Sequence, residues 1–435
     1  MFEALQNIFK IPELKKRVMF SLGMLFVYRV GCHIPTPGID GVALSHFFKQ
    51  AQGTLLGMFD MFSGGALEKL TVFALGIMPY ISSSIIFQLL TVVVPAIEKL
   101  SKEGETGRKK IIQYTRYGTV VLSVVQALGI SIGLEAMRGP AGELVVPNPG
   151  WSFRLLTVIT LTAGTAFIMW LGEQMSERGI GNGISLIIFA GIVARIPSAI
   201  GNTFKLLKTG QLSLFVLLFV FAIMFLVIAG IVFVERGQRR IPIHYAKRVV
   251  GLQTMAAQSS HLPLKVNMAG VIPPIFASSI IMFPATIANF IDVPWVKAAS
   301  KYLMPGNWVY NIIFVAFIVF FCYFYTAVTF NPIDVAENIK RHGGYIPGVR
   351  PGQETSAYLD NVLTKLTFAG SIYISVICVL PSILIGKFNL PFYFGGTALL
   401  IAIGVGMDTV AQVESHLITR SYEGFMKGVK IKGRS

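Results

Sequence analysis

The chain has 435 residues, of which 54% are apolar and 13% are charged, against about 25% charged residues in ordinary soluble domains. A soluble core of this length could not bury so much apolar surface, and the 12% aromatic content excludes a disordered chain, so the composition indicates a polytopic membrane protein. The formal net charge of +16 suits nucleic acid, anionic lipid or a charged cytoplasmic partner until the charges are placed.

Residues 1–17 are predicted to form an amphipathic helix on the cytoplasmic membrane surface. Phe2, Leu5, Ile8 and Phe9 recur at helical spacing, and basic residues follow them. The segment has no short apolar core followed by a small-residue cleavage site, so a cleavable signal peptide is not expected. A frayed tail is the alternative.

A membrane-spanning helix needs about 20 mostly apolar residues. Two apolar runs are weak, because 18–34 contains Arg29 and 184–201 is short and contains Arg195. With both accepted, the sequence predicts an all-α polytopic membrane protein with ten transmembrane helices, at 18–34, 71–95, 117–134, 155–172, 184–201, 212–234, 269–291, 309–330, 366–386 and 392–413.

The basic residues orient these spans. With the N-terminus inside, the inside segments hold 26 Lys and Arg and the outer side holds 10 when Arg195 at the outer end of the weak span 184–201 is counted with it, in agreement with the positive-inside rule. Both termini are then cytoplasmic, including the basic tail 414–435, and DNA binding is not expected. The spans divide five and five, into 18–201 and 212–413, around a hinge at 202–211. An odd number of spans in each half gives the halves opposite orientation, as in inverted repeats.

The segment 54–70, between the first two spans, is too short and too polar to cross the membrane. It combines an apolar group with a helix-breaking group: Met58, Phe59, Met61 and Phe62, then Ser63, Gly64 and Gly65. A re-entrant half-helix and an outer surface loop fit equally well, and the first is allowed at membrane depth only when it is buried in protein or lines a water-filled cavity.

No enzyme, cofactor or metal site is predicted. The sequence has no Walker A motif, the glycines at 179–185 open a membrane helix, and neither the six histidines nor the three cysteines show ligand spacing. Ionisable residues inside spans, which are typical of ion-coupled carriers, are few and lie toward span ends: Arg29, Arg195 and Asp408.

Two cytoplasmic loops are long enough to receive a large soluble partner. The 235–266 loop carries six basic residues and a single acidic one, Glu235. The 331–365 loop carries four basic and four acidic residues, and the prolines and glycines of IPGVRPG at 346–352 stiffen it around Arg350 so that it protrudes. Ordinary positive-inside loops are the alternative to a docking surface.

Six motifs resemble those of the SecY family, which forms the channel of the general protein-secretion translocon. The resemblance is to bacterial members and runs from end to end. The motifs are GGALEKLTVFALGIMPYISSSI (64–85), MSERGIGNGISLIIFAGIVARIP (175–197), FVERGQRRIPIHYAKR (233–248), HLPLKVNMAGVIPPIFASSI (261–280), GGYIPGVRPGQETSAYLD (343–360) and LPFYFGGTALLI (390–401).

The resemblance implies two inverted five-helix halves around an hourglass pore with a side opening toward lipid. It identifies 54–70 as a plug that closes the outer funnel, which decides between the two interpretations of that segment. It also implies a function, in which unfolded secretory polypeptides cross the membrane and hydrophobic segments leave sideways into lipid.

The resemblance further implies site residues. The pore constriction is an aliphatic collar, which offers ions and water no hydrogen bonds. It falls on six isoleucines: Ile77, Ile81, Ile184, Ile188, Ile275 and Ile401. The lateral gate lies between the second and third helices on one side and the seventh and eighth on the other, and the resemblance places Ser82 and Phe283 where they meet. Gln88 lies on the same helix as Ser82 and is expected to add a polar contact in the gate. The docking residues are Arg239, Arg240, Lys247 and Arg350.

The implied partners are the SecA motor or a translating ribosome, the small subunits SecE and SecG, secretory precursors with their signal peptides, and anionic lipid of the bacterial inner membrane. The missing ATP site agrees with energy supplied by a partner. Pro242, beside the basic pair, departs from the family pattern, so local loop geometry is expected to differ.

Two other classes compete with a channel. A secondary transporter with an inverted repeat would carry more polar and ionisable residues at the membrane midplane. A scaffold that only recruits ribosomes or enzymes through its basic loops would need neither a plug nor an aliphatic collar.

Overall fold

The structure is a computed structural model that describes residues 11–41, 44, 60, 63–136, 144–210, 213–245, 249–250, 253–254, 259–288, 307–388 and 396–428. Across these residues the chain is mostly helical and forms two compact units. The first unit contains Met1–Phe204, Met282–Pro305 and Ile401–Ser435, and the second contains Lys205–Ile281 and Gly306–Leu400.

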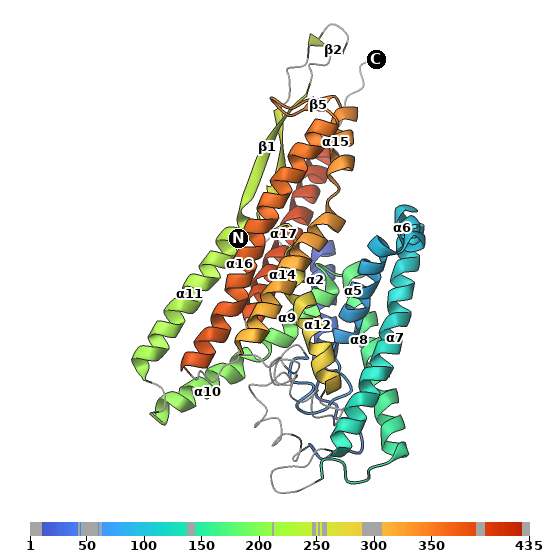
Figure 1. Ribbon diagram of the computed structural model, residues 1–435, viewed down its shortest axis with the longest axis vertical. Coiled ribbons are helices and arrows are strands. Elements are labelled where there is room, and N and C mark those ends of the chain that lie inside the picture. Colours follow the sequence, from blue (N-terminus) through green and yellow to red (C-terminus); the bar gives the residue numbers. More distant parts are fainter. Residues whose placement is uncertain are drawn as a thin grey trace. The chain divides into compact units, whose positions relative to one another are not determined.

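Helices of 8 to 33 residues build the first unit (Figure 1). They are α2 (Pro12–Gly31), α5 (Met78–Val93), α6 (Pro95–Lys102), α7 (Glu105–Ala136), α8 (Trp151–Arg178), α9 (Gly183–Val193), and the greater parts of α10 (Ile196–Lys208) and α17 (Gly396–Gly428). α8 packs against α2, α7 and α9, and α7 packs in turn against α5. Between α5 and α7 the hydroxyl of Ser83 donates to the carbonyl of Thr115 at 2.8 Å, which satisfies a polar group buried between apolar helices.

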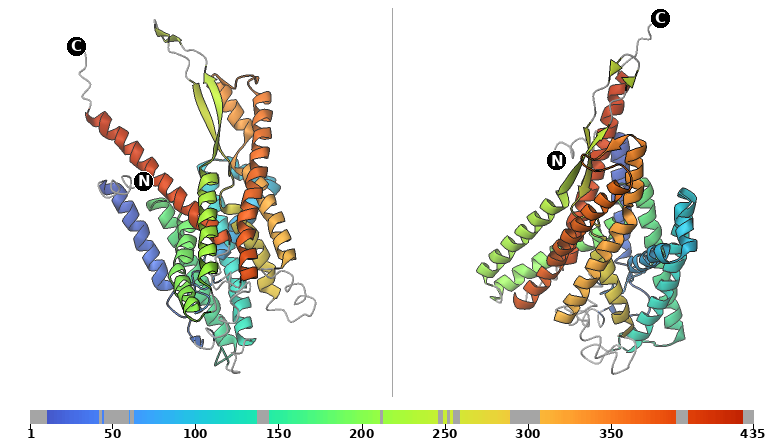
Figure 2. Two further views of the ribbon diagram at one scale, coloured as in Figure 1. Left: turned by 90° about the vertical axis from the view of Figure 1, so that its left-hand side faces the viewer. Right: turned by 45° about the horizontal axis from the view of Figure 1, so that its top comes forward.

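The second unit combines helices with a small antiparallel sheet. Its elements are α11 (Leu214–Arg236), β1 (Gln238–Tyr245), β2 (Val249–Val250), β3 (Gln253–Thr254), β4 (Ser259–Lys265), most of α12 (Ile272–Ala288), α14 (Trp308–Thr329), α15 (Pro332–Arg341), β5 (Gly344–Tyr345) and α16 (Gln353–Phe388). The sheet order is β4-β1-β5, and β2 pairs with β3. Figure 2 shows the β1–β4 hairpin rising from the end of α11 beside α15 and α16.

Each of the ten predicted spans coincides with helical structure, in α2, α5, α7, α8, α9 with α10, α11, α12, α14, α16 and α17. By length and composition, seven helices of the described part can cross a membrane, or eight if the bent pair α5–α6 is one span. α2 is not among them because it carries several basic residues, and α12 contributes a shorter apolar stretch, Ile272–Ile281. The described helices confirm an all-α polytopic membrane protein, while the predicted hinge and domain boundaries stay predictions.

The predicted span 71–95 contains a shorter helix than expected. Thr71 forms an isolated β-bridge with Pro35, residues 72–77 form successive turns, and α5 then starts with Pro79 in its first turn. α5 ends where the chain bends by 98°, at Val94. Pro95 causes this break, because it disfavours the helical conformation in the residue before it, and Val94 is extended with ψ 111°.

Two other boundaries differ from the sequence expectation. α2 runs without a break from Pro12 to Gly31, so residues 12–17 continue into the first span, and residues 1–10 lie outside the described residues. The segment 331–365 is not a stiff irregular loop, because α15 and the first turns of α16 occupy most of it, while its role as a docking loop between two spans stays a prediction. Asn331 starts α15 by accepting the backbone N–H of Ile333.

Candidate plug and channel site

The described part of the predicted plug 54–70 consists of Asp60 and the turns 63–70. Gly64 and Gly65 have positive φ angles of 68° and 86°, which glycine adopts without steric cost, so the chain reverses direction here. Most of the neighbouring side chains are buried: Ser63, Ala66, Leu67 and Leu70. Four predicted plug residues lie outside the described residues: Met58, Phe59, Met61 and Phe62.

Asp60 organises these turns from within. Its carboxylate Oδ1 accepts the backbone N–H of Glu68 at 2.8 Å. Its carbonyl accepts the backbone N–H of Gly65 at 2.9 Å and the hydroxyl of Ser63 at 3.0 Å. Because one residue satisfies three donors, Asp60 and residues 63–68 form a closed group of turns, which we call the plug turn.

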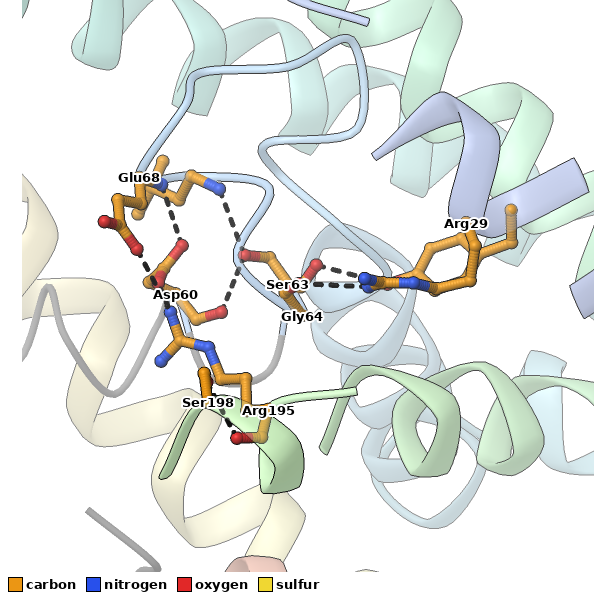
Figure 3. Close-up of polar contacts among 9 residues, drawn as sticks. Arg29, Asp60, Ser63, Gly64, Glu68, Arg195 and Ser198 are labelled. Carbon is orange, nitrogen blue, oxygen red and sulfur yellow. Dashed lines mark hydrogen bonds and ion pairs between the residues drawn. The ribbon is translucent and has the colours of Figure 1, made fainter. Parts of the chain in front are cut away.

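The end of α2 holds the plug turn through its backbone. The hydroxyl of Tyr28 donates to the carbonyl of Ser63 at 3.2 Å. Nη1 of Arg29 donates to the carbonyl of Gly64 at 3.1 Å (Figure 3). The ring of Tyr28 also stacks on Phe73, with 6.0 Å between centroids. Two adjacent residues of α2 therefore bind two adjacent carbonyls of the plug turn.

Arg195 holds the plug turn through its acidic side chains. It lies between α9 and α10, and its guanidinium forms an ion pair with the carboxylate of Asp60 (Figure 3). Its Nη2 also lies 3.7 Å from Oε2 of Glu68. The side chain of Asp60 is 4% exposed and that of Arg195 is 31% exposed, so the acid is buried and its partner is half-buried.

The plug turn also lies very close to α9. A Cβ atom built on Gly64 would lie 2.8 Å from Cα of Gly191, a distance that real Cβ atoms essentially never show. Gly64 is therefore required here for two reasons, its backbone conformation and its close approach to α9.

The six isoleucines of the predicted pore constriction come from α5 with its preceding residue, α9, α12 and α17. Five of them are buried: Ile77, Ile81, Ile188, Ile275 and Ile401. Ile184 is half-buried and packs against α8, because a Cβ on Gly172 would lie 3.0 Å from its Cγ1. Ile275 belongs to the second unit and the other five to the first, so their collar stays a prediction.

The predicted gate residues are described in part. Ser82 and Gln88 lie half-buried on α5. The amide of Gln88 donates to the hydroxyl of Ser84 on the same helix at 3.2 Å, so this polar contact is internal to α5. The backbone of Phe283 lies in α12, and its side chain lies outside the described residues.

The two predicted docking loops meet in one sheet of the second unit. β1 pairs with β4 from the same loop and with β5 from the other, where His244 lies opposite Tyr345. β1 continues through Pro242, so this proline does not interrupt the strand. A buried cluster joins the sheet, the turn after β5 and α16: Ile241, Leu264, Ile346, Leu359, Val362 and Leu363.

The predicted docking residues lie on this sheet and the turn after it. Arg239 and Arg240 are exposed on β1, and Arg350 is exposed in the turn before α16. The carbonyl of Arg350 accepts the hydroxyl of Thr355 at 2.8 Å, which ties the turn to the helix. Lys247 lies outside the described residues.

Sequence reasoning missed how Arg29 and Arg195 are used. It placed both in spans without partners, and it left Asp60 and Glu68 unused. The available signal was the cost of a charge at membrane depth, which predicts a partner for each arginine. Within the described residues, no group of three His, Cys, Asp or Glu could hold a metal ion.

The sequence matches a known protein family and individual proteins that carry its name. The chain matches the SecY family over residues 71–410. It is 53% identical to Protein translocase subunit SecY of Escherichia coli (strain K12), over 97% of this chain and 96% of that relative. It is 47% identical to Protein translocase subunit SecY of Aquifex aeolicus (strain VF5), over 98% of this chain and 100% of that relative.

Two solved structures are similar in fold. One is the structure of a SecY protein whose plug domain is described as stabilising the closed state of the translocation channel and maintaining a membrane seal. It matches with a TM-score of 0.65 and 18% sequence identity, over 95% of this chain and 97% of that chain. The other is Sec61 in the canine ribosome-channel complex from the endoplasmic reticulum, with a TM-score of 0.61 and 16% identity, over 95% of this chain and 97% of that chain. At these identities the likeness establishes the fold alone.

Proposed function

The chain belongs to the SecY family, and we propose that it is the protein-conducting channel subunit of a Sec translocase. Unfolded secretory polypeptides pass through it across the membrane, and hydrophobic segments leave it sideways into lipid. It is a channel and not an enzyme, so the energy for movement comes from a partner.

The observation that carries this proposal is the end-to-end match to a translocase subunit, 53% identical over 97% of the chain. Because the match spans nearly the whole length, it includes the plug segment and the cytoplasmic loops as well as the spans. A secondary transporter is not favoured. Arg29 and Arg195, which could have served a coupling ion, are instead engaged with the plug turn.

The plug and the collar are proposed as the two seals of the resting channel. The plug proposal is supported by the buried plug turn and by the role described for the plug domain of the related SecY protein. The collar proposal is supported by the chemistry of six aliphatic side chains, which dewet a narrow pore and close around any polypeptide without specific recognition. Ser82, Gln88 and Phe283 are proposed to line the lateral gate.

The sheet and the Arg350 turn are proposed as the docking surface for a ribosome or the SecA motor. The related Sec61 was solved in a ribosome-channel complex, which supports a ribosome as one partner. The exposed Arg239, Arg240 and Arg350 present guanidinium groups, which suit phosphates and carboxylates alike. SecE, SecG, secretory precursors with signal peptides, and anionic lipid of the bacterial inner membrane complete the proposed setting, with both termini cytoplasmic.

Reconstitution tests the proposed function. The chain is placed in liposomes with SecE, SecG and SecA, and a secretory precursor is added with ATP. We expect the precursor to become protected from external protease only when all components and ATP are present. The matched control is the same preparation with a precursor that lacks its signal peptide. A chain that protects neither precursor, yet moves a small solute against its gradient, would be a carrier instead of a polypeptide channel.

A further inference from the structure

We propose that Arg195 and Arg29 together hold the plug turn in the position seen in this structure, with Asp60 and Glu68 as the acidic partners of Arg195. We call this position the seated state of the plug and these contacts the latch. This inference rests on the proposed function, because it takes 54–70 as the plug. Charge pairing, as well as apolar packing, then keeps the plug in its resting position. These four side chains set the equilibrium between the seated and the released plug.

The two attachment points lie on different elements. Arg29 lies in the last turn of α2 and binds a backbone carbonyl, while Arg195 lies between α9 and α10 and binds two carboxylates (Figure 3). Figure 3 shows the two arginines reaching the plug turn from different sides. Because neither arginine belongs to the plug segment, both contacts must break when the plug leaves.

Asp60 links the internal order of the plug turn to its attachment. The same carboxylate that pairs with Arg195 also accepts the backbone N–H of Glu68 at 2.8 Å. Glu68 ends the turn and itself faces Arg195 at 3.7 Å. One guanidinium therefore bridges both ends of the plug turn, so a released plug turn is also expected to loosen.

The geometry predicts an asymmetry between the two partners of the pair. Asp60 is 4% exposed, whereas Arg195 is 31% exposed. Removing Arg195 leaves a buried carboxylate without its counter-charge, which strongly disfavours the seated state, because the carboxylate regains water once the plug is released. Removing the charge of Asp60 leaves a half-buried guanidinium that still faces Glu68 and solvent, which disfavours the seated state less.

A thiol placed in the plug turn reports its position. Ser63 is 1% exposed, so a thiol introduced by Ser63→Cys is shielded while the plug is seated. The three native cysteines, Cys32, Cys322 and Cys378, are buried and are replaced by Ala in this background. A membrane-impermeant maleimide is added to the outer side of intact proteoliposomes, and the rate of labelling is measured.

The latch variants are compared in this background. Arg195→Gln is expected to raise the labelling rate at least about tenfold, the change that corresponds to 1.4 kcal/mol. Asp60→Asn keeps the acceptor for Glu68 and is expected to raise it less. The double variant is expected to fall well short of the product of the single effects, because the two side chains form one pair. Arg195→Lys, which keeps the charge, is expected to rescue most of the protection.

Arg154→Gln is the matched control. It breaks another arginine–carboxylate pair of the same unit, in which Nη2 of Arg154 lies 2.6 Å from Oε2 of Glu135, without touching the plug turn. It is expected to leave labelling unchanged. If Arg195→Gln does not fold, Glu68→Gln replaces it, because the side chain of Glu68 is 30% exposed and its loss is milder.

Two results would overturn the latch: unchanged labelling in a folded Arg195→Gln or Glu68→Gln channel, or strictly multiplicative effects of Arg195→Gln and Asp60→Asn. Deletion of 57–65 separates the latch from the proposed function. A deletion that leaks ions in a planar bilayer supports the plug, whatever labelling shows. A deletion that stays silent refutes the plug, while labelling still decides whether the charges hold this segment in place.

Discussion

Replacing Gly64 by Ala is expected to unseat the plug turn more strongly than replacing Gly65 by Ala. The two glycines are adjacent and both have positive φ, 68° and 86°. A Cβ on Gly64 would lie 2.8 Å from Cα of Gly191, whereas a Cβ on Gly65 would find its nearest neighbour, Nε of Arg195, at 3.9 Å. The pair of variants therefore shares the conformational cost and differs in the steric one.

The magnitudes follow from these two costs. A left-handed conformation costs a residue with a Cβ about 1–2 kcal/mol, and this applies to both variants. Gly64→Ala additionally forces the plug turn or α9 to shift, and overpacking of this kind costs about 1–3 kcal/mol. If both costs exist only while the plug is seated, Gly65→Ala raises the released fraction by about 5- to 30-fold and Gly64→Ala by about 30-fold or more.

The assay is the resting conductance of the reconstituted complex in a planar bilayer, without precursor or motor. The open probability of each variant is compared with the unmodified channel, and size-exclusion chromatography in detergent confirms that both variants fold. Equal open probabilities for the two variants would show that the approach to Gly191 does not limit the seat. Silent traces for both would show that the seated plug turn carries no left-handed strain at these positions.

Three further perturbations test other parts of the proposal. Ser at four collar positions is expected to make the resting channel leak small ions, whereas a channel with Val at the same positions is expected to stay sealed, since each Ile→Val change costs only about 0.5–1.5 kcal/mol of stability and keeps the collar aliphatic. Planar-bilayer conductance separates the two variants, and silent traces for the Ser variant would refute the collar assignment. These four positions are Ile77, Ile81, Ile188 and Ile401. Arg350→Glu is expected to weaken motor binding by roughly thirty-fold or more, because losing a charge pair that is desolvated in the complex costs about 2–5 kcal/mol of binding free energy. Arg138→Glu, on the predicted outer side, is expected to have little effect, and equal precursor export by both variants at matched channel levels would argue against docking at this turn. Leu359→Ala, at a fully buried position of the cluster under the sheet, is expected to lower the local stability by about 2–5 kcal/mol and to speed proteolysis of the β1–β4 hairpin. Lys365→Ala, at an exposed position of the same helix, is the control, and an unchanged cleavage rate for Leu359→Ala would show that this cluster does not support the hairpin.

Composition and the placement of charge determined the membrane class and the positions of the spans. A bilayer core admits only segments that satisfy their own backbone hydrogen bonds, so long apolar runs are forced to be helices wherever they occur. This is why even the weak runs 18–34 and 184–201 coincide with helices. Helix ends were less predictable, because they depend on local features such as Pro79 and Pro95, which shorten α5 and bend the chain by 98°.

The joining of the two predicted docking loops was decided by tertiary structure. Each loop by itself reads as a charged, solvent-facing segment, and nothing in either predicts that Tyr345 pairs with His244. Strand pairing between distant segments depends on where the intervening helices α12, α14 and α15 return the chain. The strand pairing and the buried cluster then connect β1, which carries Arg239 and Arg240, to the turn that carries Arg350.

The contacts that hold the plug turn show most clearly what the sequence determines and what tertiary structure decides. The sequence by itself determined that Arg29 and Arg195 are expensive at membrane depth and that Gly64 and Gly65 break a helix. Only the tertiary structure decided that the charged partners of Arg195 are Asp60 and Glu68 and that Arg29 binds a backbone carbonyl. The physical reason is that burial cost is a property of one residue, whereas its compensation depends on which distant segments the packed helices bring within hydrogen-bond range.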